Sequence, residues 1–233
     1  MDILLKTVNL PSTLTEIGGQ AFMACMALNQ IYIPASVSKI GSLAFIGIDN
    51  LTIYCGNTKT LIGTAPTGYA IGWNTKIGFG DLGDLDMSSI WKSITTIVSK
   101  FTQTHEVIWN VAGLPQVDKS GTGEYTYLLY NDGHAELIAS KVPVGSLNTS
   151  YTIPEVIAYN GVDYKVTTIT ATAFAGNTRI KELIIPTSVT TIPSGAFEGC
   201  SSLIIKTAHT SKPSGWDNNF NVNGDGVVQV QWS

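Results

Sequence analysis

Apolar side chains recur along this chain at a fixed spacing of 23 residues. One copy of the pattern runs from Leu5 to Phe22, and a second runs from Leu28 to Phe45 and matches it position by position. Further downstream Val166, Ile169 and Ala173-Phe174 recur 23 residues later as Val189, Ile192 and Ala196-Phe197. Such self-similarity predicts a protein built from two arrays of stacked repeats.

Each repeat predicts one short strand. In Ile31-Tyr32-Ile33 the alternation places both isoleucines on the buried face and Tyr32 on the opposite face. Pro34 then ends the strand, because proline has no N–H for a continuing ladder. The later positions, represented by Val37 and Ile40, point inward again, so a repeat buries its apolar stripe only when another repeat stacks on it. The pattern therefore predicts a β-rich solenoid with little helix.

The string IPxSVxxIxxxAFxxC, from Ile185 to Cys200 and less completely from Leu10 to Cys25, resembles the BspA-like (Treponema type) leucine-rich repeat family. The resemblance covers roughly residues 5–55 and 151–205, and the period lies within the 20–29 residues of such repeats. It implies a cell-surface or extracellular adhesion role. Flanking segments are also similar to this family, residues 127–138 to its leading hairpin and Pro213–Phe220 to its closing cap. A looser cap begins at Pro66-Thr-Gly-Tyr69, with Trp73 four residues later.

The arrays depart from the family pattern at their beginnings. The first array starts at Leu5 without a leading hairpin, and the second has extra residues between Ile153-Pro154 and its first full repeat. Each array is about two repeats long, whereas about three are needed for independent stability. An unpaired strand at the N-terminal edge would favour association. We therefore expect caps, the other array or a partner to complete the packing.

The segment between the arrays has a different pattern. Residues 90, 94, 97 and 101 are apolar and fall on one helical face, which predicts a helix over 88–101. This stripe could form a coiled-coil seam, but packing against a neighbouring array is favoured. A strand is expected over 105–111 and a linker over 117–123. The expected organisation is a first leucine-rich-repeat unit at 1–80, a helix-containing linker at 81–120, and a second unit at 121–233.

Composition limits the partners. Only 13% of the 233 residues are charged, and the formal net charge is −4. A broad nucleic-acid footprint or an anionic-membrane footprint would need clustered positive charge, so neither partner is expected. The N-terminus MDILLKTVNLP lacks the basic and apolar regions of a signal peptide, and nowhere do about 18 uninterrupted apolar residues predict a membrane span.

The residues with reactive side chains favour packing over chemistry. Cys25 and Cys200 each follow an Ala-Phe pair by three residues, so the repeat places them inside as inert thiols, and Cys55 ends a strand. His105, His134 and His209 are isolated, and His134 lies in hairpin-turn sequence. No cofactor or metal site is expected. Residues 219–226 alternate like a calcium loop, but with one carboxylate they fit a Gly-Asp-Gly hairpin turn better.

No catalytic motif is present, so the chain is expected not to be an enzyme. Partner binding is assigned to the outward strand positions Asn9, Tyr32 and Ile184, because solenoids bind through such faces. The favoured function is a non-catalytic protein-binding or structural module of the bacterial surface adhesion type. The closest alternative is a phage virion component on the particle exterior, and a distant one is a hydrolase with a carboxylate pair. Expected partners are proteins, including further copies of this chain, with carbohydrate left open as a ligand.

Overall fold

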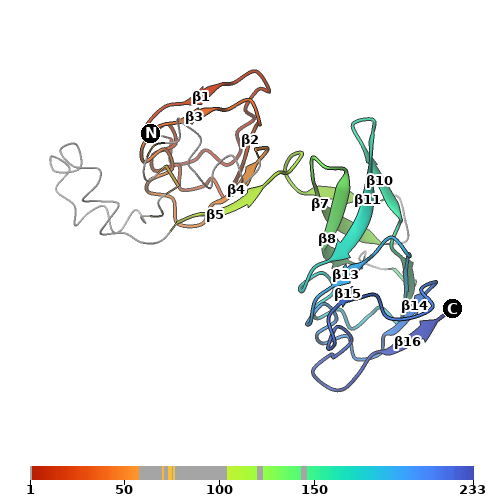
Figure 1. The fold of residues 1–233 in the computed structure, drawn as a ribbon. Helices are drawn as coiled ribbons and strands as arrows, with labels where there is room; N and C mark the ends of the chain where they lie inside the picture. Colours follow the sequence, from red (N-terminus) through yellow and green to blue (C-terminus); the bar gives the residue numbers. More distant parts are fainter. Residues whose placement is uncertain are drawn as a thin grey trace. The chain divides into compact units, whose positions relative to one another are not determined.

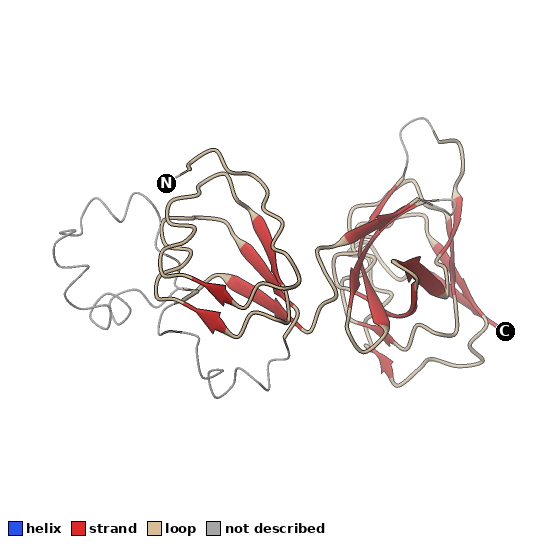
Figure 2. Cartoon of the chain, turned by 90° about the horizontal axis from the view of Figure 1, so that it is seen from above, coloured by secondary structure: helices blue, strands red, loops and turns tan. Residues whose placement is uncertain are grey.

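The computed structural model describes residues 2–57, 70, 73–74, 76, 104–119, 123–142 and 146–233. Strands, turns and loops make up these residues, and none of them is helical (Figure 2). The helix predicted over 88–101 lies outside the described residues. Among the residues described, no helix has the length and apolarity needed to cross a membrane. The contacts divide the chain into two compact units, Met1–Leu114 (unit 1) and Pro115–Ser233 (unit 2).

Unit 1 is built from parallel strand pairs (Figure 1). The strands are β1 (Glu16–Ile17), β2 (Gln30–Ile33), β3 (Lys39–Ile40), β4 (Thr52–Cys55) and β5 (Glu106–Trp109). One ladder joins β1 to β3, and a second sheet has the order β2-β4-β5. On its inner face this sheet aligns Ile31, Ile53 and Val107. The alternation of apolar and polar residues therefore places one side of each strand in the core, as predicted.

The strand β5 corrects the predicted organisation. A strand was expected over 105–111 in a separate linker, and β5 lies in this range, but it pairs in parallel with β4 inside unit 1. Its residue Glu106 lies beside Thr52, 54 residues earlier in the chain. A search at a spacing of 23 residues cannot find such a repeat, because a long segment separates the two strands.

Unit 2 contains two sheets. The first has the order β15-β13-β11-β8-β7-β6, with β10 paired to β11, and the second has the order β16-β14-β12-β9. The strands are β6 (Gln116–Asp118), β7 (Glu124–Leu129), β8 (His134–Lys141), β9 (Ser150–Thr152), β10 (Val156–Tyr159), β11 (Val162–Ile169), β12 (Glu182–Ile185), β13 (Thr191–Ile192), β14 (Ile204–Thr207), β15 (Gly215–Trp216) and β16 (Gln229–Trp232). All pairs in the second sheet are parallel, and so are the pairs β8–β11, β11–β13 and β13–β15.

Unit 2 contains two antiparallel hairpins, one before its repeats and one after Pro154. The hairpin β7–β8 turns at residues 131–133, where Gly133 has a φ of 89°, and His134 follows as the first residue of β8. The extra residues after Pro154 form the hairpin β10–β11. Residues 116–118 form β6, which pairs with β7. Residues 117 and 118 fall within the linker predicted over 117–123. Unit 2 therefore begins with antiparallel strands, whereas the described residues of unit 1 contain only parallel pairs.

The 23-residue spacing marks the buried interior of both units. Ile17 is 4% exposed, and Ile40, Ile169 and Ile192 are fully buried. The phenylalanines of the repeats stack on one another, Phe22 on Phe45 and Phe174 on Phe197. Their backbones are joined in the same way, since the N–H of Phe22 donates to the carbonyl of Ala44 and that of Phe174 to the carbonyl of Ala196. The core residues predicted from the repeat are thus confirmed.

The two units end alike. In unit 1 the N–H of His105 donates to the carbonyl of Asn74 at 2.9 Å and β5 follows, and in unit 2 the N–H of Val228 donates to Asn221 at 2.8 Å and β16 follows. The preceding cap residues also correspond: Trp73 is 8% exposed and Phe220 is 3% exposed. Residues 75–104 of unit 1 therefore occupy the position in the chain that residues 222–227 occupy in unit 2.

Candidate functional site

The outer face of the sheet β2-β4-β5 carries two aligned rows of side chains. The ladder registers place Gln30 beside Thr52 and Glu106 in one row. In the second row Tyr32 lies beside Tyr54 and Ile108. All three residues of the second row are half-buried, whereas the inner side chains of β2 and β4 are buried. The sheet thus presents an aromatic and aliphatic row next to a polar row.

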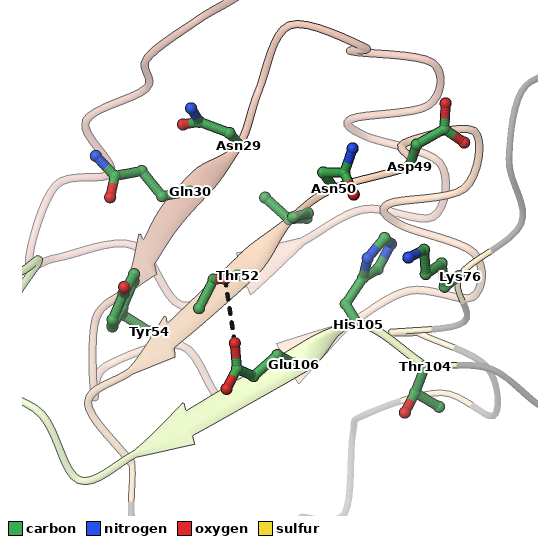
Figure 3. Close-up of a pocket in the computed structure, with 11 residues that line it drawn as sticks. Asn29, Gln30, Asp49, Asn50, Thr52, Tyr54, Lys76, Thr104, His105 and Glu106 are labelled. Carbon is green, nitrogen blue, oxygen red and sulfur yellow. Dashed lines mark hydrogen bonds between the residues drawn. The ribbon is translucent and has the colours of Figure 1, made fainter. Parts of the chain in front are cut away.

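A hollow of about 600 Å³ lies at the amino ends of these three strands (Figure 3). Residues of the strands and of the turns before them line it: Asn29, Gln30, Asp49, Asn50, Leu51, Thr52, Tyr54, Lys76, Thr104, His105 and Glu106. Most of these side chains are polar. The hollow therefore combines amide, carboxylate and hydroxyl groups with the phenol ring of Tyr54 and the imidazole of His105.

Several polar side chains of this hollow have no hydrogen bond among the residues that the structure describes. The hydroxyl of Thr52 donates to Glu106 Oε2 at 3.4 Å. The side-chain amides of Asn29, Gln30 and Asn50 have no hydrogen-bond partner among the residues that the structure describes. Burial, and secondly the charge of Glu106, raises the pKa of Tyr54, so this phenol keeps its proton at neutral pH.

His105 forms part of the lining and is 3% exposed. Its Nε2 lies 3.3 Å from the carbonyl oxygen of Phe45, so this nitrogen carries the proton and donates. Burial lowers the pKa of His105, and the bond to Phe45 opposes this more weakly. The ring is therefore neutral, and its Nδ1 is an acceptor that has no partner within the described part of the chain.

On the equivalent face of unit 2 the acidic side chain is paired. In the row Ser150-Glu182-Ile204-Gln229, Glu182 accepts a hydrogen bond from Ser150 at 2.8 Å and pairs with Lys206 at 2.5 Å. The Lys206 and Ser150 bonds hold the pKa of Glu182 below its usual range. A different hollow, of about 420 Å³, lies at the other end of these strands beside Ile184, Lys206 and Trp232. In this row Glu182, the counterpart of Gln30, is therefore paired with its neighbours Ser150 and Lys206.

The three residues assigned to partner binding from the sequence do not form one site. Asn9 is exposed, but its segment lies in no strand. Tyr32 lies on the outer face of β2, and Ile184, which is 38% exposed, lies on the outer face of β12 in unit 2. Sequence reasoning missed Asn50, Tyr54 and Glu106. The sequence does contain a signal for the strand that carries Glu106. Glu106-Val-Ile-Trp109 matches Gln229-Val-Gln-Trp232, which is the last strand of unit 2.

The cysteines are packing residues, as predicted. Cys25, Cys55 and Cys200 are all free and buried. Burial raises the pKa of the Cys25 and Cys200 thiols, which keeps them in the unreactive protonated form. The thiol of Cys200 donates to the carbonyl of Phe174 at 3.2 Å.

Residues 219–226 form the predicted hairpin turn, closed by an antiparallel bridge between Val222 and Val227. The amide of Asn221 donates to the carbonyl of Val228, and that of Asn223 donates to the carbonyl of Cys200. Within the described ranges, no three His, Cys, Asp or Glu side chains are grouped so that they could hold a metal ion. These asparagines therefore serve the fold.

Stacked parallel strands and a 23-residue pattern with a common buried interior define a leucine-rich-repeat protein. A model of the BspA type leucine rich repeat region matches residues 2–64 and 156–216 in six copies, just over half of the chain, so the chain belongs to this family. Members are typically surface-associated, generally non-catalytic, and mediate protein interactions.

A solved structure of a leucine-rich repeat protein from Bacteroides capillosus ATCC 29799 is 23% identical, with a TM-score of 0.37, and the match covers 50% of this chain and 98% of that chain. No curated protein matches this chain.

Proposed function

We propose that this chain is a non-catalytic protein-binding module of the bacterial surface adhesion type, formed by two short solenoid units. The observation that carries the proposal is the row Tyr32-Tyr54-Ile108 on the outer face of unit 1. Tyrosine is enriched in protein interfaces, because its ring buries a large apolar area and its hydroxyl still finds a polar partner. The row lies on a sheet whose inner side is packed, so it is presented in a fixed arrangement.

A binding assay on immobilised matrix proteins tests this function. We would measure binding of the purified chain to collagen, laminin and fibronectin by surface plasmon resonance, and compare Tyr32→Ala with Ile184→Ala at the corresponding position of unit 2. Tyr32→Ala should weaken capture by roughly tenfold or more, as loss of an interface tyrosine does, and leave the melting temperature nearly unchanged. Unchanged capture by Tyr32→Ala, or no capture by the wild type, would contradict the proposal.

A second candidate is a structural component assembled on a particle, such as a phage virion exterior. It is supported by exposed apolar side chains in unit 1, where Leu4 is 76% exposed and Ile3 is 42% exposed. Exposed apolar side chains favour association with another chain. Light scattering should then show assembly that increases with concentration, whereas a monomer at all concentrations would count against it. Tail and capsid genes beside the coding sequence would favour this candidate over the adhesin.

Catalysis is not part of the proposal. Asp49 and Glu106 line one hollow, as a carboxylate-pair hydrolase would need, but His105 beside them is neutral and bonded to the backbone. Chromogenic glycoside and ester substrates should therefore show no turnover above that of a Glu106→Gln variant. Turnover that is lost in Glu106→Gln would establish the hydrolase instead.

A further inference from the structure

We propose that the hollow at the amino ends of β2, β4 and β5 binds a saccharide. This site is separate from the protein-binding function proposed above, although Tyr54 borders both. The proposal comes from the chemistry of the lining, from its contrast with unit 2, and from the size of the hollow.

The polar lining suits a ligand that carries many hydroxyl groups. Each sugar hydroxyl both donates and accepts, so it pairs well with side-chain amides, which also do both, and with carboxylates, which accept. The amides of Asn29, Gln30 and Asn50 have no partner among the described residues. The carboxylate of Glu106 has one long bond, 3.4 Å from the Thr52 hydroxyl. These groups are therefore available to a ligand without first breaking strong bonds.

Tyr54 supplies the complementary apolar surface. One face of a pyranose ring exposes mostly C–H groups, which pack on the face of an aromatic ring. Tyr54 is half-buried on the central strand and lies between Tyr32 and Ile108 in the ladder. Its neighbours on both sides limit its motion. Binding therefore requires little ordering of this side chain, which reduces the entropic cost.

His105 provides an independent sign of a missing polar partner. Within the described part of the chain its Nδ1, an acceptor, has no hydrogen bond, and the ring is 3% exposed. Such orphaned groups are costly and uncommon in folded proteins. The residue at the same structural position in unit 2 is the apolar Val228.

The charges and the size narrow the ligand class. The lining carries two carboxylates, Asp49 and Glu106, and one cation, Lys76. Its charge therefore does not favour a phosphate or another anion. A peptide anchored by apolar side chains would need a more apolar lining than this one. A volume of about 600 Å³ falls within the roughly 300–1,000 Å³ of small-molecule sites. One or two neutral sugar units fit these requirements best.

An NMR titration of the whole chain tests the site. The probes are the methyl glycosides of glucose, galactose and N-acetylglucosamine, and the disaccharides lactose and cellobiose. At least one probe should shift the side-chain amide signals of Asn29, Gln30 and Asn50 and the backbone signal of Thr52. Asn50→Ala and Glu106→Gln should each weaken that binding by tenfold or more, because each removes hydrogen bonds to the sugar.

Matched controls keep the test decisive. Gln229→Ala changes the unit 2 residue that corresponds to Glu106 and should leave saccharide binding unchanged. A far-ultraviolet circular dichroism melt of every variant shows that it is folded, and Asn50→Asp serves in place of Asn50→Ala if the latter unfolds. The proposal is overturned if no sugar shifts these signals, if both site variants bind as well as the wild type, or if the peptide Ala-Ser-Asn gives equal shifts.

The outcome is distinguishable from that of the protein-binding proposal. Tyr32 does not line the hollow. Tyr32→Ala should therefore lose matrix-protein capture and keep the saccharide shifts. Asn50→Ala should lose the saccharide shifts and keep matrix-protein capture.

Discussion

Unit 1 and unit 2 share their repeats and their ends but differ in how they begin. In unit 2 Phe174 contacts both the next repeat, through Phe197, and Tyr125 of the hairpin β7–β8. In unit 1 the corresponding Phe22 stacks on Phe45, and within the described residues no aromatic ring takes the place of Tyr125. Phe174 is 2% exposed, whereas Phe22 is only half-buried. The repeat therefore specifies the buried interior of a unit. In unit 2 the hairpin β7–β8 additionally covers the first phenylalanine of the repeats.

The shared interior predicts equal and large losses of stability. Phe45 and Phe197 are both fully buried at corresponding positions. Replacing either with alanine should lower the free energy of unfolding of its own unit by about 3–5 kcal/mol, as removal of a large core side chain does. Hydrogen exchange in denaturant, followed separately for the amides of β4 and β14, would measure both. A loss below about 1 kcal/mol in one unit would show that the two interiors are not equivalent.

The first layers should respond unequally. Phe174→Ala removes a ring packed on two others and should cost about 3–5 kcal/mol, whereas Phe22→Ala removes a half-buried ring and should cost about 1–2 kcal/mol. The same exchange measurement in each unit gives the two values. Equal losses would mean that the end of unit 1 is covered as well as that of unit 2.

Gly56 in unit 1 lies where unit 2 has a larger residue. A methyl group at Gly56 would lie 2.7 Å from the backbone nitrogen of Ala35 and 2.8 Å from the hydroxyl of Tyr32. Unit 2 has Ala208 at this position and Ile184 in place of Tyr32. Gly56→Ala should therefore destabilise unit 1 by about 1–3 kcal/mol through overpacking.

The double variant Gly56→Ala with Tyr32→Ile tests the cause of that loss. It should recover part of the stability in a thermal melt, because the isoleucine removes the clashing hydroxyl and leaves the contact with Ala35. If the double variant recovers no stability, the clash of the added methyl group is with the backbone of Ala35 alone.

The smallest expected effect concerns pH. Burial lowers the pKa of His105, so as the pH falls through about 6.5 the unfolded chain takes up a proton before the folded chain does. Unit 1 should lose stability over that range through this ring, and unit 2, with Val228 at the same position, lacks this contribution. His105→Val should cost about 1 kcal/mol at pH 7.5 through the lost bond to Phe45, and should reduce the acid sensitivity of unit 1. Melting curves at pH 7.5 and 5.5 measure both effects, and an unchanged pH dependence would contradict the assignment.

The local pattern predicted the interior well, because burial of Ile17, Ile40, Ile169 and Ile192 depends only on spacing within adjacent repeats. The local pattern did not predict that β5 belongs to unit 1, because residues 75–104 separate this strand from its cap and interrupt the 23-residue period. The polar hollow depends on that same strand, since Glu106 and His105 join Asn29 and Asn50 only after β5 pairs with β4. Contacts between distant segments therefore decided which residues form the candidate site, and period alone could not supply them.

The hydrogen bond from the His105 N–H to the Asn74 carbonyl, and its counterpart from the Val228 N–H to the Asn221 carbonyl, bring the chain back onto the sheet at the same place in both units, although the intervening segments differ in length. This junction is thus a natural insertion point. An engineered scaffold could carry a foreign epitope or affinity loop in place of the short turn at residues 222–227, with the final strand still entering in register.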